Sequence, residues 1–394
     1  MPSIRPPKYV LAVCKRLESH GYKAFLVGGC VRDCVMGRRP GDWDVCTDAL
    51  PSEVAAIFPN NRPTGIKHGT VTVLERGSNV EITTFRSDGE YKDHRRPENV
   101  SFITDLTSDL QRRDFTVNSI ALSLNGIIFD PFSGMADIEK KIIRCVGDPN
   151  KRFAEDALRM FRAVRFSATL GFKIEEQTLV AIENNAYLAT SLASERVCSE
   201  TEKILLSGAP QYFEFLIHSG LMSEYVRNNT ISIDLSPLAQ LPKNRAQRWA
   251  ALCALLCRYK IISNSEDFLK RLRLDSATVS NASCGCDSAL AGAPKNKLEW
   301  KRLLAKKGVA CGNCTAAASQ VLGGRKTIRQ LQTVISSGDC YSLKRLNIDG
   351  NDLLELGILG PALGNTLSAL LDYVLEHPDE NVHDILLDRA KSMI

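Results

Sequence analysis

Two aspartates separated by a single residue are the side chains with the clearest chemical potential in this sequence. Asp42 and Asp44 would project from the same face of an extended segment, because side chains alternate between the two faces of a strand. Magnesium prefers carboxylate and phosphate oxygens, and a two-metal site activates an attacking oxygen while stabilising a departing pyrophosphate. The pair therefore predicts a Mg²⁺ site with Asp42 and Asp44 as metal ligands and catalytic residues. The alternative is a capping or solvated loop feature, which is the commoner use of Asp-x-Asp.

Glu81 is the candidate for a third catalytic carboxylate. Residues 71–75 and 80–86 have the composition of two strands, and residues 76–79 have that of the turn between them. The expected hairpin carries Glu81 on its second strand. From there its carboxylate could complete the cage around the metal.

A glycine pair precedes the aspartates, between an expected strand over residues 23–27 and an expected helix over residues 30–36. Gly28 and Gly29 would let the backbone turn tightly against a ligand, and a triphosphate would sit at the helix N-terminus. Arg32 would add a fixed positive charge near the phosphates. A glycine pair alone is usually only a turn, but this one, followed in order by the two aspartates, predicts nucleotidyl transfer.

Asp156 and Arg159 lie three residues apart on a helix expected over residues 153–166, so they would share one face. A carboxylate accepts a hydrogen bond from the exocyclic amine of cytosine or adenine, which uracil lacks, and a guanidinium suits the ring nitrogen or carbonyl beside that amine. Such a pair would accept C and A and reject U and G without a nucleic-acid template. The alternative is a plain salt bridge between the two residues.

The overall composition is that of an ordinary globular protein. The 394 residues are 44% hydrophobic and 24% charged, with a formal net charge of +5 that permits an RNA partner without arguing for one. The N-terminus lacks the apolar core of a secretory signal, and the densest apolar run, 249–257, is too short for a membrane span. Thirteen cysteines, an odd number, favour reduced thiols over a disulfide framework. We therefore expect a cytoplasmic protein.

Strand-like runs nearly end at about residue 147. Before it, short β-type runs alternate with helical stretches, which indicates a mixed catalytic head; after it, amphipathic helical patterns continue to the C-terminus. Residues 276–295 are rich in Ser, Ala, Gly and Cys, which predicts a linker or a loose helix junction. Domain boundaries are expected near residues 148, 207 and 275.

Five runs follow one another along the chain: 26–33 with Asp42 and Asp44, 111–118, 155–159, 194–196 with Glu200, and 349–361. In this order they resemble the motifs of class II tRNA nucleotidyltransferases, the CCA-adding enzymes, of the bacterial type without a phosphohydrolase domain. The resemblance implies an α+β fold, with a polymerase-β-like nucleotidyltransferase head followed by all-helical domains. The implied domains are the catalytic head (1–148), a neck that selects the nucleotide (149–207), a body (208–275) and a tail that binds tRNA (276–394).

The same resemblance implies an activity. It is the template-independent addition of CCA to the 3′ end of tRNA from CTP and ATP, with no membrane or DNA partner. An A-adding or CC-adding enzyme or a bacterial poly(A) polymerase would share the head motifs. A non-catalytic tRNA-binding scaffold would be expected to have a damaged metal motif, and here both aspartates are present.

Further nucleotide-binding residues are implied by the resemblance. Arg162 and Arg165 would bind the triphosphate, or else be surface arginines. Arg113, Asp114 and Asn118 would organise the nucleotide and the primer sugar, or else form a structural hinge.

The charged segment 87–101 resembles the flexible loop of the family, which would sit beside the metal site. Members that add only CC have this loop shortened, so its intact length implies competence for the terminal A. The alternative is a solvated connection.

Several other signals are weaker. Cys284, Cys286, Cys311 and Cys314 could hold zinc, although the family has no metal there. The tryptophans are expected to be packing residues rather than base-stacking platforms. Basic clusters in the tail would form a salt-sensitive RNA-binding surface, or merely solvated helix faces; they comprise Lys301, Arg302, Lys306, Lys307, Arg325, Lys326 and Arg329.

Overall fold

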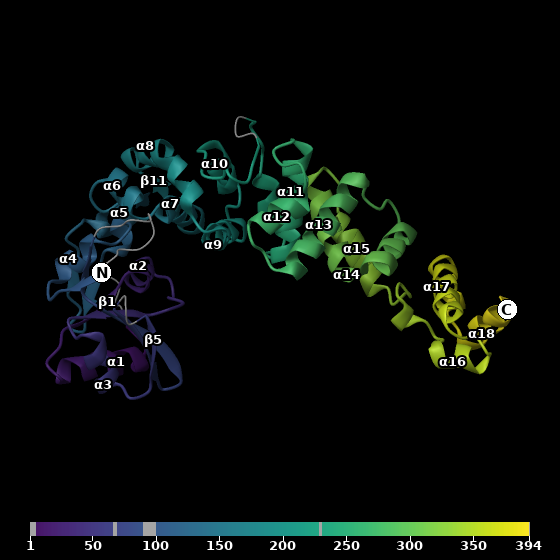
Figure 1. Cartoon of the computed structure of the whole chain (residues 1–394), viewed down its shortest axis with the longest axis horizontal. Helices are drawn as coiled ribbons and strands as arrows, with labels where there is room; N and C mark the ends of the chain where they lie inside the picture. Colours follow the sequence, from purple (N-terminus) through teal and green to yellow (C-terminus); the bar gives the residue numbers. More distant parts are fainter. Residues whose placement is uncertain (1–4, 66–68, 90–99, 228–230, 394) are drawn as a thin grey trace. The chain divides into compact units, whose positions relative to one another are not determined.

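The chain forms two compact units. The structure, a computed structural model, describes residues 5–65, 69–89, 100–227 and 231–393 (Figure 1). Unit 1 comprises Met1–Ile204 with Phe215–Glu224, and unit 2 comprises Leu205–Glu214 with Tyr225–Ile394. The four-domain division expected from the sequence stays a prediction.

Unit 1 is built on a mixed sheet. In the described residues its seven strands run in the order β3 (Asn61–Gly65), β4 (Thr70–Glu75), β5 (Ser78–Thr84), β2 (Asp44–Thr47), β1 (Ala24–Val27), β8 (Ala121–Ser123) and β9 (Ile128–Phe129). Strands β2 and β5 are parallel, and the other neighbouring pairs are antiparallel. The parallel pair places Asp44 directly opposite Glu81.

Helix α1 (Lys8–Ser19) packs against the sheet through one apolar face. Its buried residues Val10, Val13, Cys14 and Leu17 are spaced by three or four, which gathers them on one helix face. That face packs on β1, β4 and β5, and α3 (Pro51–Ile57) packs beside it (Figure 1). Helix α2 (Gly29–Val35) follows β1 directly and contacts the one-turn 3₁₀ helix Thr116–Asn118.

The remainder of unit 1 is mainly helical. Beyond β9 it contains α5 (Gly134–Lys140), α6 (Pro149–Glu155), α7 (Leu158–Leu170), α8 (Glu176–Asn185) and most of α9 (Ser194–Leu205). The expectation of an all-helical remainder was slightly wrong, because β11 (Lys173–Ile174) pairs in parallel with β10 (Ile142–Ile143).

The single helix expected over residues 153–166 is wrong. It is broken between α6 and α7, and Asp156 has an extended backbone with φ −140° and ψ 102°. Its Oδ1 accepts a hydrogen bond from the backbone N–H of Leu158 at 3.1 Å. Short carboxylate side chains compete in this way for local backbone donors, which interrupts a helix.

Unit 2 is helical in its described part. Helices α11 (Arg245–Arg258), α13 (Ser276–Ala291) and α14 (Lys297–Val321) pack together, with α12 (Ser265–Arg271) and α15 (Thr327–Ser336) against them. Trp249 is fully buried and meets the rings of Phe213 and Phe268 edge-on. Trp300 joins a second core that includes α16 (Gly350–Glu355), α17 (Pro361–Glu376) and α18 (His383–Lys391). Trp43 is buried as well, so the prediction of three packing tryptophans is confirmed.

The linker expected over residues 276–295 is wrong. Most of it is α13, a helix of 16 residues whose small side chains bring it close to α14. A Cβ atom at Gly285 would lie 2.3 Å from Cβ of Cys314, so only glycine fits there. The composition that suggested a loose junction is that of a tight helix contact.

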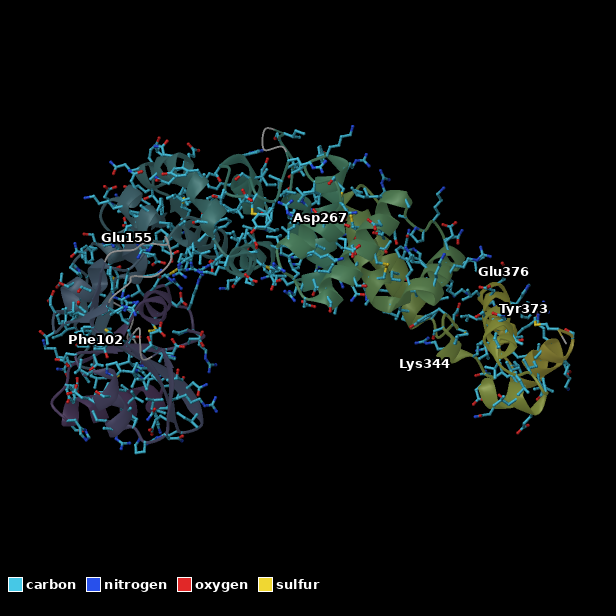
Figure 2. All side chains as sticks on the ribbon, in the orientation of Figure 1. Phe102, Glu155, Asp267, Lys344, Tyr373 and Glu376 are labelled. Carbon is cyan, nitrogen blue, oxygen red and sulfur yellow. A yellow bond between two sulfur atoms is a disulfide. The ribbon has the colours of Figure 1, made fainter. Side chains whose placement is uncertain are left out.

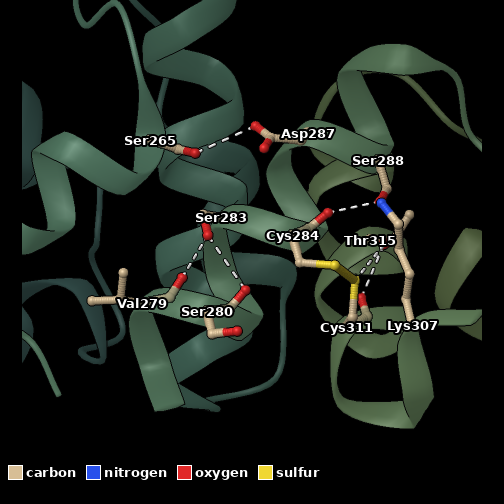
Figure 3. The surroundings of a disulfide bond; sticks show 10 residues. All are labelled: Ser265, Val279, Ser280, Ser283, Cys284, Asp287, Ser288, Lys307, Cys311 and Thr315. Atoms are coloured by element: carbon tan, nitrogen blue, oxygen red, sulfur yellow. Dashed lines mark hydrogen bonds between the residues drawn. A yellow bond between two sulfur atoms is a disulfide. The ribbon is translucent and has the colours of Figure 1, made fainter. Parts of the chain in front are cut away.

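The cysteines between α13 and α14 are also not as expected. Cys284 and Cys311 form a disulfide, which links the two helices (Figure 3). The prediction of reduced thiols is therefore wrong for this pair and holds for the other eleven cysteines. A four-thiolate zinc site is excluded in this structure, because two of its four sulfur atoms bond to each other.

An ion pair joins two helices of unit 2. Glu376, which belongs to α17 together with Tyr373 (Figure 2), pairs with Arg302 of α14.

Within the described residues, no helix combines the length and the hydropathy that a membrane span needs.

Candidate active site

The three predicted carboxylates belong to one region of unit 1, with Asp44 between the other two. Asp44 opens β2 and is in register with Glu81 on β5, and Asp42 occupies the bend just before that strand. Burial, followed by the charges of Glu81 and Asp42, raises the pKa of Asp44 to about 6, although the Arg113 guanidinium opposes this rise. The site therefore concentrates negative charge that a cation would neutralise.

The carboxylate oxygens of this site suit a hard cation whose remaining ligands are phosphate and water. Within the described residues, no three carboxylate, imidazole or thiol groups are already gathered around one point. Magnesium is commonly held by only one or two carboxylates together with substrate phosphates and water. Asp42 and Asp44 fit that mode, and the participation of Glu81 stays a prediction.

The glycine turn before α2 lies against the same site. Gly28 has φ +78°, and a Cβ atom there would lie 3.3 Å from Nη1 of Arg113 and 4.0 Å from Oδ2 of Asp44. The backbone conformation favours glycine, and a side chain here would press on the Arg113 guanidinium. Gly29 then begins α2, one residue before the helix start expected from the sequence.

Replacing Gly28 by alanine should therefore lower activity more than stability. A positive φ with ψ −133° costs a residue other than glycine about 1–3 kcal/mol, and displacement of Arg113 should reduce kcat by about 10- to 100-fold, because small misplacements near reacting groups are costly. Gly21→Ala is the matched control, because Gly21 has φ +87° but nothing within 4 Å of its Cβ position. Equal kcat values for the two variants would show that the approach at Gly28 has no catalytic role.

A chain of hydrogen bonds links the predicted nucleotide-binding residues. Arg32 is buried and donates from Nη1 to Oδ1 of Asn118 at 2.7 Å. Asn118 donates from Nδ2 to Oδ1 of Asp114 at 3.2 Å. The other carboxylate oxygen of Asp114 accepts from Nε of Arg162 at 2.7 Å. Residues from α2, the 3₁₀ helix and α7 are thus fixed relative to one another.

These hydrogen bonds favour the ionised form of Asp114. Burial alone would raise its pKa, but the Arg162 guanidinium and the Asn118 amide lower it to about 2. Arg113 is anchored separately, by an ion pair of 3.1 Å with the fully buried carboxylate of Asp109. Asp109 was not predicted from the sequence, although its spacing of four residues from Arg113 is the signal that could have found it.

Three arginines converge on the ring of Phe166. The guanidinium carbons of Arg32, Arg162 and Arg165 lie 5.3, 5.4 and 3.7 Å from its centroid. Arg165 is also paired with Glu200, whose side chain is only 5% exposed. Sequence reasoning missed Phe166, which carries no charge and looks like any core residue of an amphipathic helix.

Asp156 and Arg159 do not pair with each other, so the plain salt bridge considered from the sequence is wrong. Asp156 accepts two hydrogen bonds from Arg196 of α9, at 3.2 and 3.0 Å. Arg159 pairs instead with Glu155, at the end of α6 (Figure 2), and donates to the carbonyl of Arg112 at 3.0 Å. Each member of the predicted base-selecting pair thus has its own anchor.

The segment expected to be a flexible loop is only partly within the described residues. Strands β6 (Arg86–Asp88) and β7 (Val100–Phe102) pair antiparallel at its two ends. Residues 90–99, which carry most of its charge, lie outside the described residues.

Comparisons with known proteins agree along the whole chain. Residues 24–144 match the Poly A polymerase head domain, and residues 171–226 match the probable RNA and SrmB-binding site of polymerase A. A CCA-adding enzyme of Geobacillus stearothermophilus is 43% identical over 407 residues, covering 99% of each chain. One of Limosilactobacillus fermentum is 36% identical over 391 residues, covering 97% of this chain and 96% of the relative. The chain belongs to the CCA-adding enzymes.

Solved structures give the same result. The crystal structure of the Bacillus stearothermophilus CCA-adding enzyme in complex with CTP superposes with a TM-score of 0.78, at 33% identity and 99% coverage of both chains. A Thermotoga maritima CCA-adding enzyme complexed with tRNA shares the fold, with a TM-score of 0.68 at 20% identity. The predicted family, α+β fold class and activity, the template-independent addition of CCA to tRNA, are confirmed.

The basic tail residues of this CCA-adding enzyme differ in exposure and in pairing. Lys301 is only 3% exposed and lies 3.2 Å from the carboxylate of Asp339, so its expected place on an RNA-binding surface is wrong. Arg302 is exposed but paired with Glu376. The other predicted members are exposed on α14 and around the start of α15: Lys306, Lys307, Arg325, Lys326 and Arg329.

Proposed function

We propose that Asp42 and Asp44 hold Mg²⁺ during CCA addition and that the enzyme extends tRNA in the cytoplasm, using CTP and ATP. The observation that carries the proposal is the position of Asp44, opposite Glu81 and within 4.0 Å of the Cβ position of Gly28. Metal-binding carboxylates and a phosphate-sized turn thus meet at one point.

The arginines around Phe166 would bind the triphosphate. Arg32, Arg162 and Arg165 gather positive charge at one place, and their partners Asp33, Asp114 and Glu200 fix the guanidinium groups before a nucleotide arrives. Fixed charges stabilise a developing negative charge without reorganising during the reaction. Bound divalent cations would supply activation of the primer hydroxyl and neutralisation of the pyrophosphate.

Base choice would rest on Asp156 and Arg159. Arg196 holds Asp156 through one hydrogen bond to each carboxylate oxygen. Oδ1 also accepts from the backbone N–H of Leu158, so Oδ2 is the oxygen with a second lone pair to offer. A base with an exocyclic amine can donate to it, whereas uracil presents a carbonyl. The anchors at Arg196 and Glu155 keep the two side chains in position without a nucleic-acid template.

Changing Asp156 to asparagine should weaken base choice. The substitution replaces an acceptor by a donor, and an unmatched group costs about 1–3 kcal/mol, so we expect discrimination between CTP and UTP in kcat/KM to fall by about 5- to 150-fold. Asp148→Asn is the control, because Asp148 caps α6 through its side chain and asparagine caps equally well. Undiminished rejection of UTP by the Asp156 variant would refute the assignment.

The activity itself is tested with a tRNA transcript truncated before its CCA end. The transcript is incubated with magnesium and each nucleoside triphosphate, alone and together, and the 3′ ends are sequenced. CCA without U or G is the expected product. CC alone, A added only to CC-ended tRNA, or long A tails would select a related specificity. Retained tRNA binding without any incorporation would identify a non-catalytic scaffold.

A further inference from the structure

A basic cavity lies at the end of α2 opposite the glycine turn. It has a volume of about 550 Å³, and three arginines, Arg5, Arg38 and Arg39, contribute to its wall. None of the described residues that line it is acidic. Arg38 and Arg39 are exposed, and neither forms an ion pair with any residue that the structure describes. We call this cavity the arginine pocket.

The charge of the arginine pocket distinguishes it from another large cavity of unit 1. That cavity, of about 610 Å³, is walled mainly by apolar residues and carries Lys23 with two carboxylates, Asp105 and Asp130. The end of α2 adds no attraction for an anion, because the C-terminus of a helix carries partial negative charge. Anion binding in the arginine pocket must therefore come from its arginines.

The arginine pocket also touches the catalytic segment. Gly41 and Trp43 are part of its wall, and both are chain neighbours of Asp42, with Cα atoms about 3.8 Å from that of Asp42. The triphosphate cradle at Gly28 lies at the other end of α2, about 10 Å away along a seven-residue helix. The arginine pocket and the glycine turn thus lie at opposite ends of α2.

We propose that the arginine pocket binds a backbone phosphate of the tRNA 3′ strand, the phosphodiester next to the primer terminus. The inference rests on the proposed function, in which the terminal hydroxyl meets Asp42 and Asp44. The anion nearest to that hydroxyl in the RNA is the phosphate on the 5′ side of the terminal nucleotide. Guanidinium groups suit phosphate oxygens, because their N–H donors can engage two oxygens together.

The first test measures the binding of truncated tRNA without nucleotide or metal. In the double variant R38Q/R39Q we expect Kd to rise at least about tenfold at moderate salt, and the slope of log Kd against log salt to fall by about 0.7–0.9, the contribution of one phosphate contact. The KM for CTP should stay within twofold. The control R62Q/R76Q removes the same charge from exposed arginines of β3 and the β4–β5 turn and should leave Kd within about threefold.

A second measurement identifies the phosphate. The last phosphodiester of the primer is replaced by an uncharged methylphosphonate, and the two changes are combined in a double-mutant cycle. We expect the replacement to weaken binding by the wild type and to have little further effect on R38Q/R39Q. Additive losses would overturn the proposal, and so would a loss seen only when the 5′-terminal phosphate of the tRNA is removed.

Other outcomes are equally decisive. Wild-type tRNA affinity in R38Q/R39Q, or a raised KM for CTP with unchanged tRNA affinity, would overturn the proposal. R38K/R39K keeps the charge but loses the paired N–H donors, so its Kd should lie between those of the wild type and R38Q/R39Q, and matching melting temperatures would exclude misfolding as the cause of any loss. If the wild type binds tRNA but adds no CCA, the proposed function fails instead, so the two failures are distinguishable.

Discussion

The Asp44→Asn variant should lose nucleotide addition by at least about 10³-fold in kcat, because a metal-binding carboxylate supplies several kcal/mol of transition-state stabilisation. The substitution keeps the shape of the side chain but removes its charge. Asp44 is partly buried beside like charges; its burial, and then the charges of Glu81 and Asp42, raise its pKa to about 6. Loss of its charge should therefore reduce repulsion in the empty site and leave the fold intact. Single-turnover incorporation of CTP into truncated tRNA measures the effect.

Two comparisons make this prediction specific. Asp379→Asn changes an exposed aspartate of unit 2 and should leave kcat unchanged. The Kd of the Asp44 variant for tRNA should remain within a few-fold of the wild-type value, because binding draws on basic residues elsewhere. Retention of more than a tenth of wild-type kcat would remove Asp44 from the metal site.

The same measurement of kcat would test whether Glu81 is a metal ligand. A loss in Glu81→Gln comparable to that in Asp44→Asn would make Glu81 a third metal ligand. A loss of only a few-fold would limit it to an electrostatic effect on Asp44.

Replacement of Arg248 by methionine should destabilise unit 2 by at least about 1–3 kcal/mol, the cost of leaving a buried hydrogen-bonding group unpaired. Arg248 is 1% exposed, and among the described residues no carboxylate pairs with it. It donates instead to four backbone carbonyls, those of Leu205, Ser207, Leu241 and Pro242, at 2.6–3.1 Å. Methionine fills similar space but leaves these carbonyls buried without donors.

Guanidinium unfolding followed by tryptophan fluorescence would measure this effect, because Trp249 and Trp300 both lie in unit 2. Arg258→Met is the matched control, since Arg258 is exposed at the end of the same helix. It should change the free energy of unfolding by no more than about 0.5 kcal/mol. Equal stabilities of the two variants would show that the carbonyls find other donors.

Local features of the site were predictable from sequence. The glycine turn, the helix after it, the hairpin that carries Glu81 and the spacing of Asp42 and Asp44 all involve residues close together in the chain. Backbone sterics and side-chain periodicity operate over such distances, so residue type and spacing are sufficient. The helical character of the chain beyond the head followed from periodicity in the same way.

Other local inferences failed because packing overrides propensity. Residues 276–295 look flexible by composition, yet Gly285 and its small neighbours form a helix that fits tightly against α14. At Asp156 the chain could continue the helix, or it could leave the helix while the Asp156 carboxylate accepts a hydrogen bond from the backbone N–H of Leu158. The hydrogen bond from Arg196 to the same carboxylate favours the second arrangement. The partner of Asp156 lies 40 residues away, whereas α14 is the next helix after α13; in both cases the deciding contact is between elements and not within one.

The sequence by itself determined which chemistry the chain can perform, because the carboxylates, glycines and arginines are local motifs. Only the tertiary structure decided which of these groups meet. The parallel pairing of β2 and β5 sets Asp44 beside Glu81, and the packing of α7 on the head brings Arg162 to Asp114. Each of these contacts closes a long loop of the chain, which costs conformational entropy. Burial of apolar side chains throughout the unit offsets that cost, and the two residues in contact contribute little of it. No short motif can therefore encode them.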